Sequence, residues 1–147
     1  MDDEHFAMQL KGKSIYLDLF YHPLVEMDRP ALQRTLFNAQ ARLQRQILAH
    51  GNGPLSPDPW YTTRRPGENV TMCAKSWTNP ETKKLNQMTF QTLLDVAVAV
   101  FEFLFIQKRR GSVMMSVVDT TITPGPEKCG TVIVRPFLPS GLLAFDA

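Results

Sequence analysis

The chain has 147 residues, of which 44% are hydrophobic and 20% are charged. This length predicts one domain, 1–147, which can bury a core without disulfides, and the composition excludes an intrinsically disordered chain. A formal net charge of +2 is too small to argue for nucleic acid, and two cysteines exclude a disulfide framework and a four-thiolate zinc site.

The N-terminus, MDDEHF, is acidic and precedes no apolar segment, so it predicts a cytoplasmic protein without a signal peptide. The alternative is a mature secreted chain with an added Met. That alternative stays open because of the sequon at Asn69 and the even number of cysteines. Cys73 and Cys129 can form a disulfide or remain two buried thiols. The longest apolar run, 93–106, falls short of the roughly 20 residues of a membrane span.

Four segments have the period of two that is typical of strands. The first, 14–22, is apolar on both faces, and Pro23 is expected to end it. The second covers 69–77, and the last two, 113–118 and 131–135, are separated by turn residues around 124–127 and predict a hairpin.

Two segments have the pattern of helices. Asp28 and Pro30 predict a helix start, an apolar stripe runs through 32–47, and Gly51 marks the end. A second helix is expected from about 87–89 to Arg110, apolar on nearly all sides from 93 to 106, with Lys108–Arg110 complementing the helix dipole at its end.

Three segments carry no such period and divide the predicted domain: an N-terminal arm (1–12), a long Pro/Gly loop (52–67) and an apolar C-terminal tail (137–147). The element order is therefore strand, helix, strand, helix, strand, strand. This order predicts an α+β two-layer sandwich, a four-stranded, mostly antiparallel sheet with two helices on one face. The opposite face keeps Tyr16, Phe20 and Trp77, which favours a covering tail, loop or second copy, and hence a homodimer.

Catalytic and cofactor motifs are absent from the sequence. The three histidines have no metal-ligand spacing, and no glycine-rich phosphate loop is present, so neither a metal nor a cofactor is predicted. For an enzyme, the proton-transfer candidates are Asp18 and His22, four residues apart on one strand face, and Glu102 in the apolar helix.

The long loop, 52–67, gives a stronger indication of function than these proton-transfer candidates do. It contains Trp60, Tyr61, Arg64 and Arg65, which together with Trp77 form the predicted recognition surface, because aromatic residues and arginines commonly anchor interfaces. We therefore expect a binding or interaction protein whose partner is a second copy of the chain, another protein or an apolar small molecule. Nucleic acid ranks below these, since acidic residues nearly balance basic ones. The alternatives are a small cofactor-independent isomerase or cyclase with an apolar pocket, and a secreted effector-like or toxin-like factor.

Overall fold

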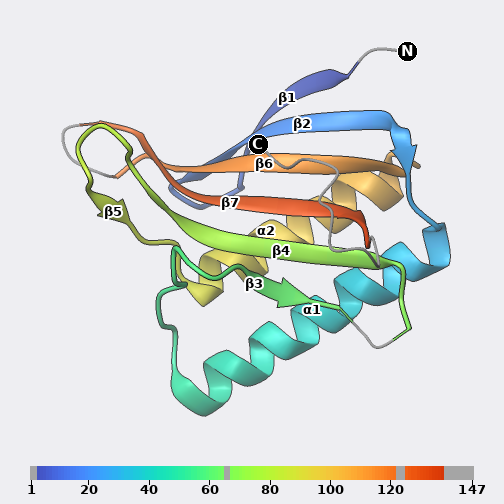
Figure 1. Ribbon diagram of the computed structural model, residues 1–147, viewed down its shortest axis with the longest axis horizontal. Helices are drawn as coiled ribbons and strands as arrows, with labels where there is room; N and C mark the ends of the chain where they lie inside the picture. The colour runs from blue at the N-terminus through green and yellow to red at the C-terminus, as the bar shows by residue number, and fades with distance from the viewer. Residues whose placement is uncertain (1–2, 65–66, 122–124, 138–147) are drawn as a thin grey trace.

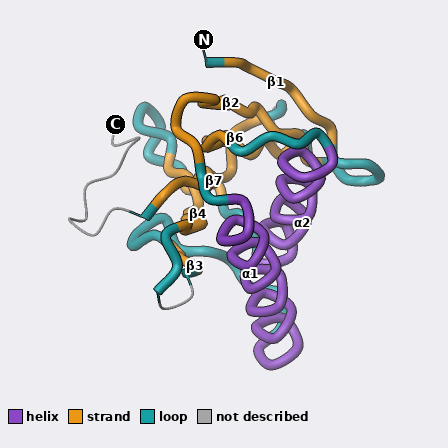
Figure 2. Tube along the Cα trace, turned by 90° about the vertical axis from the view of Figure 1, so that its right-hand side faces the viewer, coloured by secondary structure: helices purple, strands orange, loops and turns teal. Residues whose placement is uncertain are grey.

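A computed structural model describes residues 3–64, 67–121 and 125–137 of the chain. It is an α+β structure in which two helices lie on the same side of one antiparallel sheet (Figures 1 and 2). The sheet has seven strands, so the prediction of a four-stranded sheet is wrong.

The four predicted strands form the middle of the sheet. They are β2 (Ile15–Glu26), β6 (Gly111–Asp119), β7 (Glu127–Pro136) and β4 (Val70–Thr78), adjacent in that order. The pairings are all antiparallel, and β6 and β7 form the predicted hairpin. Strand β2 continues past Pro23, because a register shift between His22 and Glu26 lets the chain pass the missing backbone donor.

The three additional strands are short and lie at the edges. Strand β1 (Glu4–Gln9) occupies much of the segment predicted as an N-terminal arm and pairs with β2. Strand β3 (Tyr61–Thr63) lies inside the predicted long loop, and β5 (Leu85–Asn86) follows a turn; both pair with β4. The predicted C-terminal tail, apart from Phe137, lies outside the described residues.

Helix α1 (Arg29–His50) has the predicted ends. The Asp28 carboxylate accepts a hydrogen bond from the Ala31 backbone N–H at 3.0 Å, and Gly51 ends the helix with a φ of 81°. The apolar stripe is confirmed at Leu32, Leu36 and Leu43, which are fully buried. The helix therefore contributes one face to the core.

Helix α2 (Phe90–Phe101) is shorter than predicted, because residues Glu102–Ile106 continue it as a π-helical turn, η1. The basic residues 108–110 lie beyond that turn. The Arg109 guanidinium lies 4.8 Å from the centre of the Phe6 ring and donates to Glu4 at 3.0 Å, so Arg109 joins the end of η1 to β1. Arg110 pairs with Glu26 of β2 at 3.3 Å. The predicted interaction of these basic residues with the helix dipole stays a prediction.

The core lies between the helices and one face of the sheet. Leu17, Leu19, Val113, Met115 and Val134 are fully buried there. Within the described part of the chain, no helix is long and apolar enough to cross a membrane.

Candidate functional site

The face of the sheet turned away from the helices, called here the open face, carries the candidate site. Because side chains alternate along a strand, the register assigns one residue in two of each central strand to it. Its members on the four central strands are Tyr16, Asp18, Phe20, His22, Ser112, Met114, Ser116, Val118, Thr131, Ile133, Arg135, Thr71, Cys73, Lys75 and Trp77.

A depression of about 250 Å³ lies on the open face near the start of β7. We call it the lysine–tryptophan depression. It is lined by Trp60, Lys75, Trp77, Met114, Lys128, Thr131 and Ile133. The two tryptophans of the chain therefore share one site with two lysines.

Each lysine of this depression lies over a tryptophan ring. The Lys75 ammonium is 4.3 Å from the centre of the Trp60 ring, and the Lys128 ammonium is 5.6 Å from that of Trp77. Such cation–π contacts hold the charge beside an apolar surface, at about 0.5–1 kcal/mol each where solvent reaches them. The depression thus presents two positive charges framed by indole rings.

The two ammonium groups also influence one another. Burial, and after it the charge of Lys75, lower the pKa of Lys128 below its ordinary value. None of the residues that line the depression is acidic. An anionic group bound there would relieve the unfavourable charge of Lys128, so the site is electrostatically suited to an anion.

A second depression of about 340 Å³ borders the first. Both include Lys75 and Trp77, and the second extends toward the turn after β4. Its remaining lining residues are Pro57, Ser76, Thr78 and Pro80. An elongated ligand could therefore run across Trp77 from one depression to the other.

Of the predicted recognition residues, Trp60 and Trp77 are brought together and Tyr61 is not. Trp60 immediately precedes β3, and Tyr61 begins it, so their side chains point to opposite sides of the sheet. Tyr61 packs edge-on against Phe90 at 5.6 Å on the helix side. The predicted surface is consequently divided between two places.

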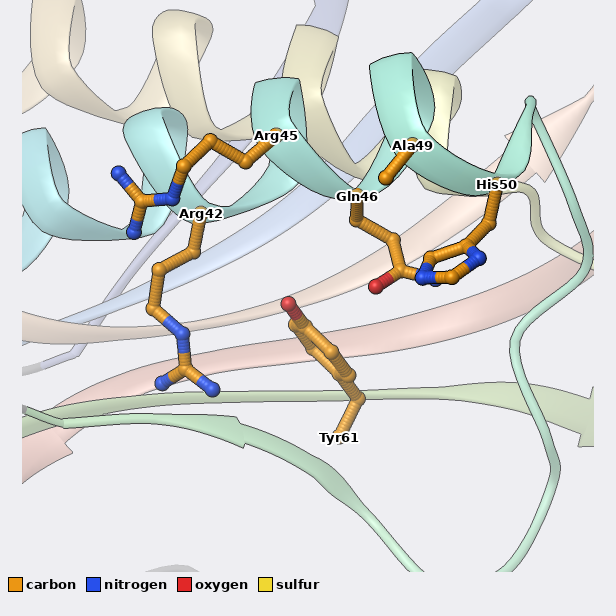
Figure 3. A pocket seen from close by; sticks show the side chains of 6 residues that line it. All are labelled: Arg42, Arg45, Gln46, Ala49, His50 and Tyr61. Carbon is orange, nitrogen blue, oxygen red and sulfur yellow. The ribbon is translucent and has the colours of Figure 1, made fainter.

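Tyr61 instead lines a groove of about 320 Å³ between α1 and β3. Figure 3 shows Arg42, Gln46 and His50 extending from α1 toward the tyrosine. Arg42 and Arg45 are exposed, and neither forms an ion pair with another described residue. The nearby C-terminal end of α1 carries a partial negative charge that disfavours anions, so we rank this groove below the open face.

Arg64, another of the predicted recognition residues, makes contacts within the described chain. Its guanidinium lies 3.7 Å from the centre of the Phe137 ring, and its Nε donates to the Glu68 backbone carbonyl at 2.8 Å. Arg65 lies outside the described residues.

The predicted proton-transfer residues do not converge. Asp18 contacts His5 and His22 contacts Asp3 at 2.8 Å, each on the β1–β2 side of the open face. Glu102 belongs to η1 and lines a different depression, of about 270 Å³, beside Asp95. These three side chains therefore do not form one acid–base site.

Both cysteines are free and buried. Cys73 lies opposite Ile133 in the β4–β7 register, and Cys129 is four residues before Ile133, or roughly 13 Å along the strand. Burial, followed by the charge of Asp119, raises the pKa of Cys129 to about 12. This thiol is therefore poorly suited to act as a nucleophile. Among the residues that the structure describes, no three His, Cys, Asp or Glu side chains gather as a metal site requires.

The sequence analysis missed Lys75, Lys128 and Arg135. The signal for Lys75 was present, because Lys75 and Trp77 are two residues apart on a strand and share a face. Lys128 and Arg135 join the site only through the pairing of β4 with β7, which local pattern does not reveal.

The geometry defines a two-layer α+β protein with an aromatic and basic site on the sheet face that lies opposite its two helices. Comparison with known proteins finds no family model, no curated protein and no solved structure that matches this chain. The function must therefore be argued from the site itself.

Proposed function

We propose that this protein is an interaction protein, and that the lysine–tryptophan depression binds an acidic, partly apolar segment of another protein. The observation that carries the proposal is the pair of ammonium groups, Lys75 and Lys128, each over a tryptophan ring in a depression without acidic lining residues. Glutamate or aspartate side chains complement the charge, and apolar side chains complement Trp60, Trp77 and Met114.

The shape of the site favours binding over catalysis. A catalytic pocket for an apolar substrate is expected to enclose it, with an acid or base of perturbed pKa inside. The two depressions around Trp77 lie on a sheet surface. The group of shifted pKa among their lining residues is the amine of Lys128, in the lysine–tryptophan depression. The isomerase or cyclase hypothesis and the secreted-factor hypothesis remain predictions without an observation in their favour.

A homodimer through this same surface is disfavoured. A two-fold interface brings identical patches together, so two copies would oppose their lysines directly. Homodimerisation, expected from the sequence, therefore remains a prediction, and a homodimer would have to form through another surface.

The test uses tryptophan emission, because both tryptophans of the chain lie in the depression. The probe is a synthetic peptide that alternates glutamate with leucine, and the matched control peptide carries lysine in place of glutamate. We expect the acidic peptide to shift the emission and the basic peptide to leave it unchanged. Binding should weaken with added salt, as expected for paired charges at a surface.

Variants assign the binding to the site. Lys75→Ala combined with Lys128→Ala should abolish the emission change, whereas Lys11→Ala, an exposed lysine elsewhere, should retain it. Equal responses to both peptides would refute the proposal. A response to single-stranded oligothymidylate that exceeds the response to the acidic peptide would refute it in favour of nucleic acid, since aromatic and basic surfaces also stack bases.

A further inference from the structure

Arg135 is a buried cation on the open face without a partner among the described residues. Its side chain is only 5% exposed, and its Nη1 atom is buried with no hydrogen-bond partner. The guanidinium group forms no ion pair with the residues that the structure describes. Among the residues that the structure describes, Arg135 is the only buried one with a charged side chain.

Such a group is unfavourable unless an anion accompanies it. A guanidinium group is positively charged in proteins, so burying one leaves a charge that needs compensation. Removing an unpaired charge from water is strongly unfavourable, whereas a carboxylate can satisfy two guanidinium N–H donors at once. An oxyanion bound beside Arg135 would therefore compensate its charge.

The neighbouring polar groups are already engaged. Thr71, directly opposite Arg135 on β4, donates its hydroxyl hydrogen to the Thr63 carbonyl at 3.2 Å. On β6, Ser112 donates to the Val25 carbonyl at 2.8 Å. Of the nearby carboxylates, Glu68 binds Arg34. None of these groups supplies the missing negative charge.

Arg135 lies next to a residue that lines the lysine–tryptophan depression. Ile133, which lines that depression, precedes Arg135 by two residues on the same face of β7, or roughly 7 Å. The open face thus carries cations at both ends of an apolar centre formed by Met114 and Ile133: Lys75 and Lys128 at one end and Arg135 at the other.

We propose that Arg135 is the anchoring residue for a carboxylate of the bound ligand, which it holds through a bidentate ion pair. The ligand then extends over Ile133 and Met114 toward Lys75 and Lys128, so it carries at least two acidic groups separated by an apolar part. This inference rests on the proposed function and specifies its ligand further. The carboxylate can belong to a side chain of a protein segment or to a free dicarboxylic acid.

The first experiment compares the thermal unfolding midpoint of the wild type and of Arg135→Met in acetate, succinate and chloride at matched ionic strength. Carboxylate buffers should raise the midpoint of the wild type and not that of Arg135→Met. Removing the unpaired charge should leave the variant at least as stable as the wild type in chloride. A midpoint that is the same in carboxylate and chloride would overturn the inference.

The second experiment measures affinity for the glutamate–leucine peptide and for succinate. Arg135→Met should weaken peptide binding about tenfold to a hundredfold, as expected for a lost charged hydrogen-bond pair. Arg135→Lys, which keeps the charge without the planar fork, should weaken it less and provides the readout if Arg135→Met does not fold. Tighter binding of succinate than of the peptide would assign the carboxylate to a free diacid.

The outcomes separate this inference from the proposed function. If Lys75→Ala with Lys128→Ala loses the peptide and Arg135→Met retains it, the inference fails and the proposed function stands. If the peptide does not bind at all, the proposed function fails, and the acetate comparison still tests Arg135. If Arg135→Met instead lowers the unfolding midpoint in chloride, the guanidinium group already has a stabilising partner within the chain, and the inference is overturned.

Discussion

The hydroxyl of Ser76 donates a hydrogen bond to the carbonyl of Leu55 at 2.7 Å, and it accepts one from the Met88 backbone N–H at 2.9 Å. The backbone N–H of Ser76 also donates to the Ser56 carbonyl at 3.1 Å. One buried side chain on β4 thereby joins the loop before Trp60 to the segment that leads into α2. We expect this connection to help hold Trp60 over Lys75, because Ser56 precedes Trp60 by only four residues.

We predict that Ser76→Ala lowers the free energy of unfolding by about 1–3 kcal/mol, because buried backbone groups lose their partner. Chemical denaturation monitored by circular dichroism measures this. Ser116→Ala, at a half-buried position on the open face, should change stability by less than about 0.5 kcal/mol. Equal losses of unfolding free energy in the two variants would contradict the role assigned to the Ser76 hydroxyl.

Gly111 has no room for a side chain. A Cβ atom there would lie 2.4 Å from the His22 carbonyl oxygen and 2.9 Å from the Pro23 Cα. Both are backbone atoms, so the strands would have to move, and we expect Gly111→Ala to cost about 3 kcal/mol. Gly125→Ala, with nothing within 4 Å of the added atom, is the control in thermal denaturation and should be nearly neutral. A neutral Gly111→Ala would show that this register of β2 and β6 is wrong.

Lys128 should make stability depend on alkaline pH. Its pKa is lower in the folded protein than in the unfolded chain, where it is near 10.5. Below the lowered pKa, the buried charge destabilises the folded state, and this cost disappears as the pH rises toward 10.5. Lys128→Met should therefore be more stable than the wild type at neutral pH, and the difference should narrow as the pH rises.

Urea titrations at a series of pH values follow that difference. Lys11→Met, at an exposed position, controls for general effects of alkaline pH. A stability difference that is constant between pH 7 and pH 10.5 would contradict a lowered pKa for Lys128.

Cys129 should not react with iodoacetamide in the folded protein. Its thiol is 2% exposed, and its pKa is raised to about 12, so the reactive thiolate is scarce at pH 8. Mass spectrometry should find Cys129 unmodified in the native protein and alkylated after denaturation. Cys73, which is 6% exposed, serves as the internal comparison. Rapid native labelling of Cys129 would indicate that the start of β7 opens.

The long periodic elements could be predicted from the sequence and the short ones could not. The apolar stripe that includes Leu32 and Leu36 predicts a helix over many residues, and the alternation through 113–118 predicts a strand. In contrast, β3 and β5 contain three and two residues, too few for a period to be recognised. In β1, Phe6 and Met8 alternate with exposed residues. This strand therefore had the period of two, but over too few residues for a clear prediction.

The residues of the candidate site could likewise be predicted only in part, because their positions depend on how the short strands pair. Trp60 and Trp77 could be chosen by residue type, but whether they lie together depends on β3 pairing with β4. Tyr61, chosen on the same ground, points to the other side because it follows Trp60 by one residue. Arg135 could not be recognised, since only the burial of its side chain among paired strands makes its charge significant.

The opposite directions of Trp60 and Tyr61 limit how the length of this chain can vary in evolution. Adding or removing one residue between Trp60 and Thr63 would exchange the sides of the sheet that these aromatic rings occupy. It would thereby remove an indole from Lys75 and a phenol from Phe90 at once. Homologous chains should therefore keep a fixed spacing from Trp60 to Thr63.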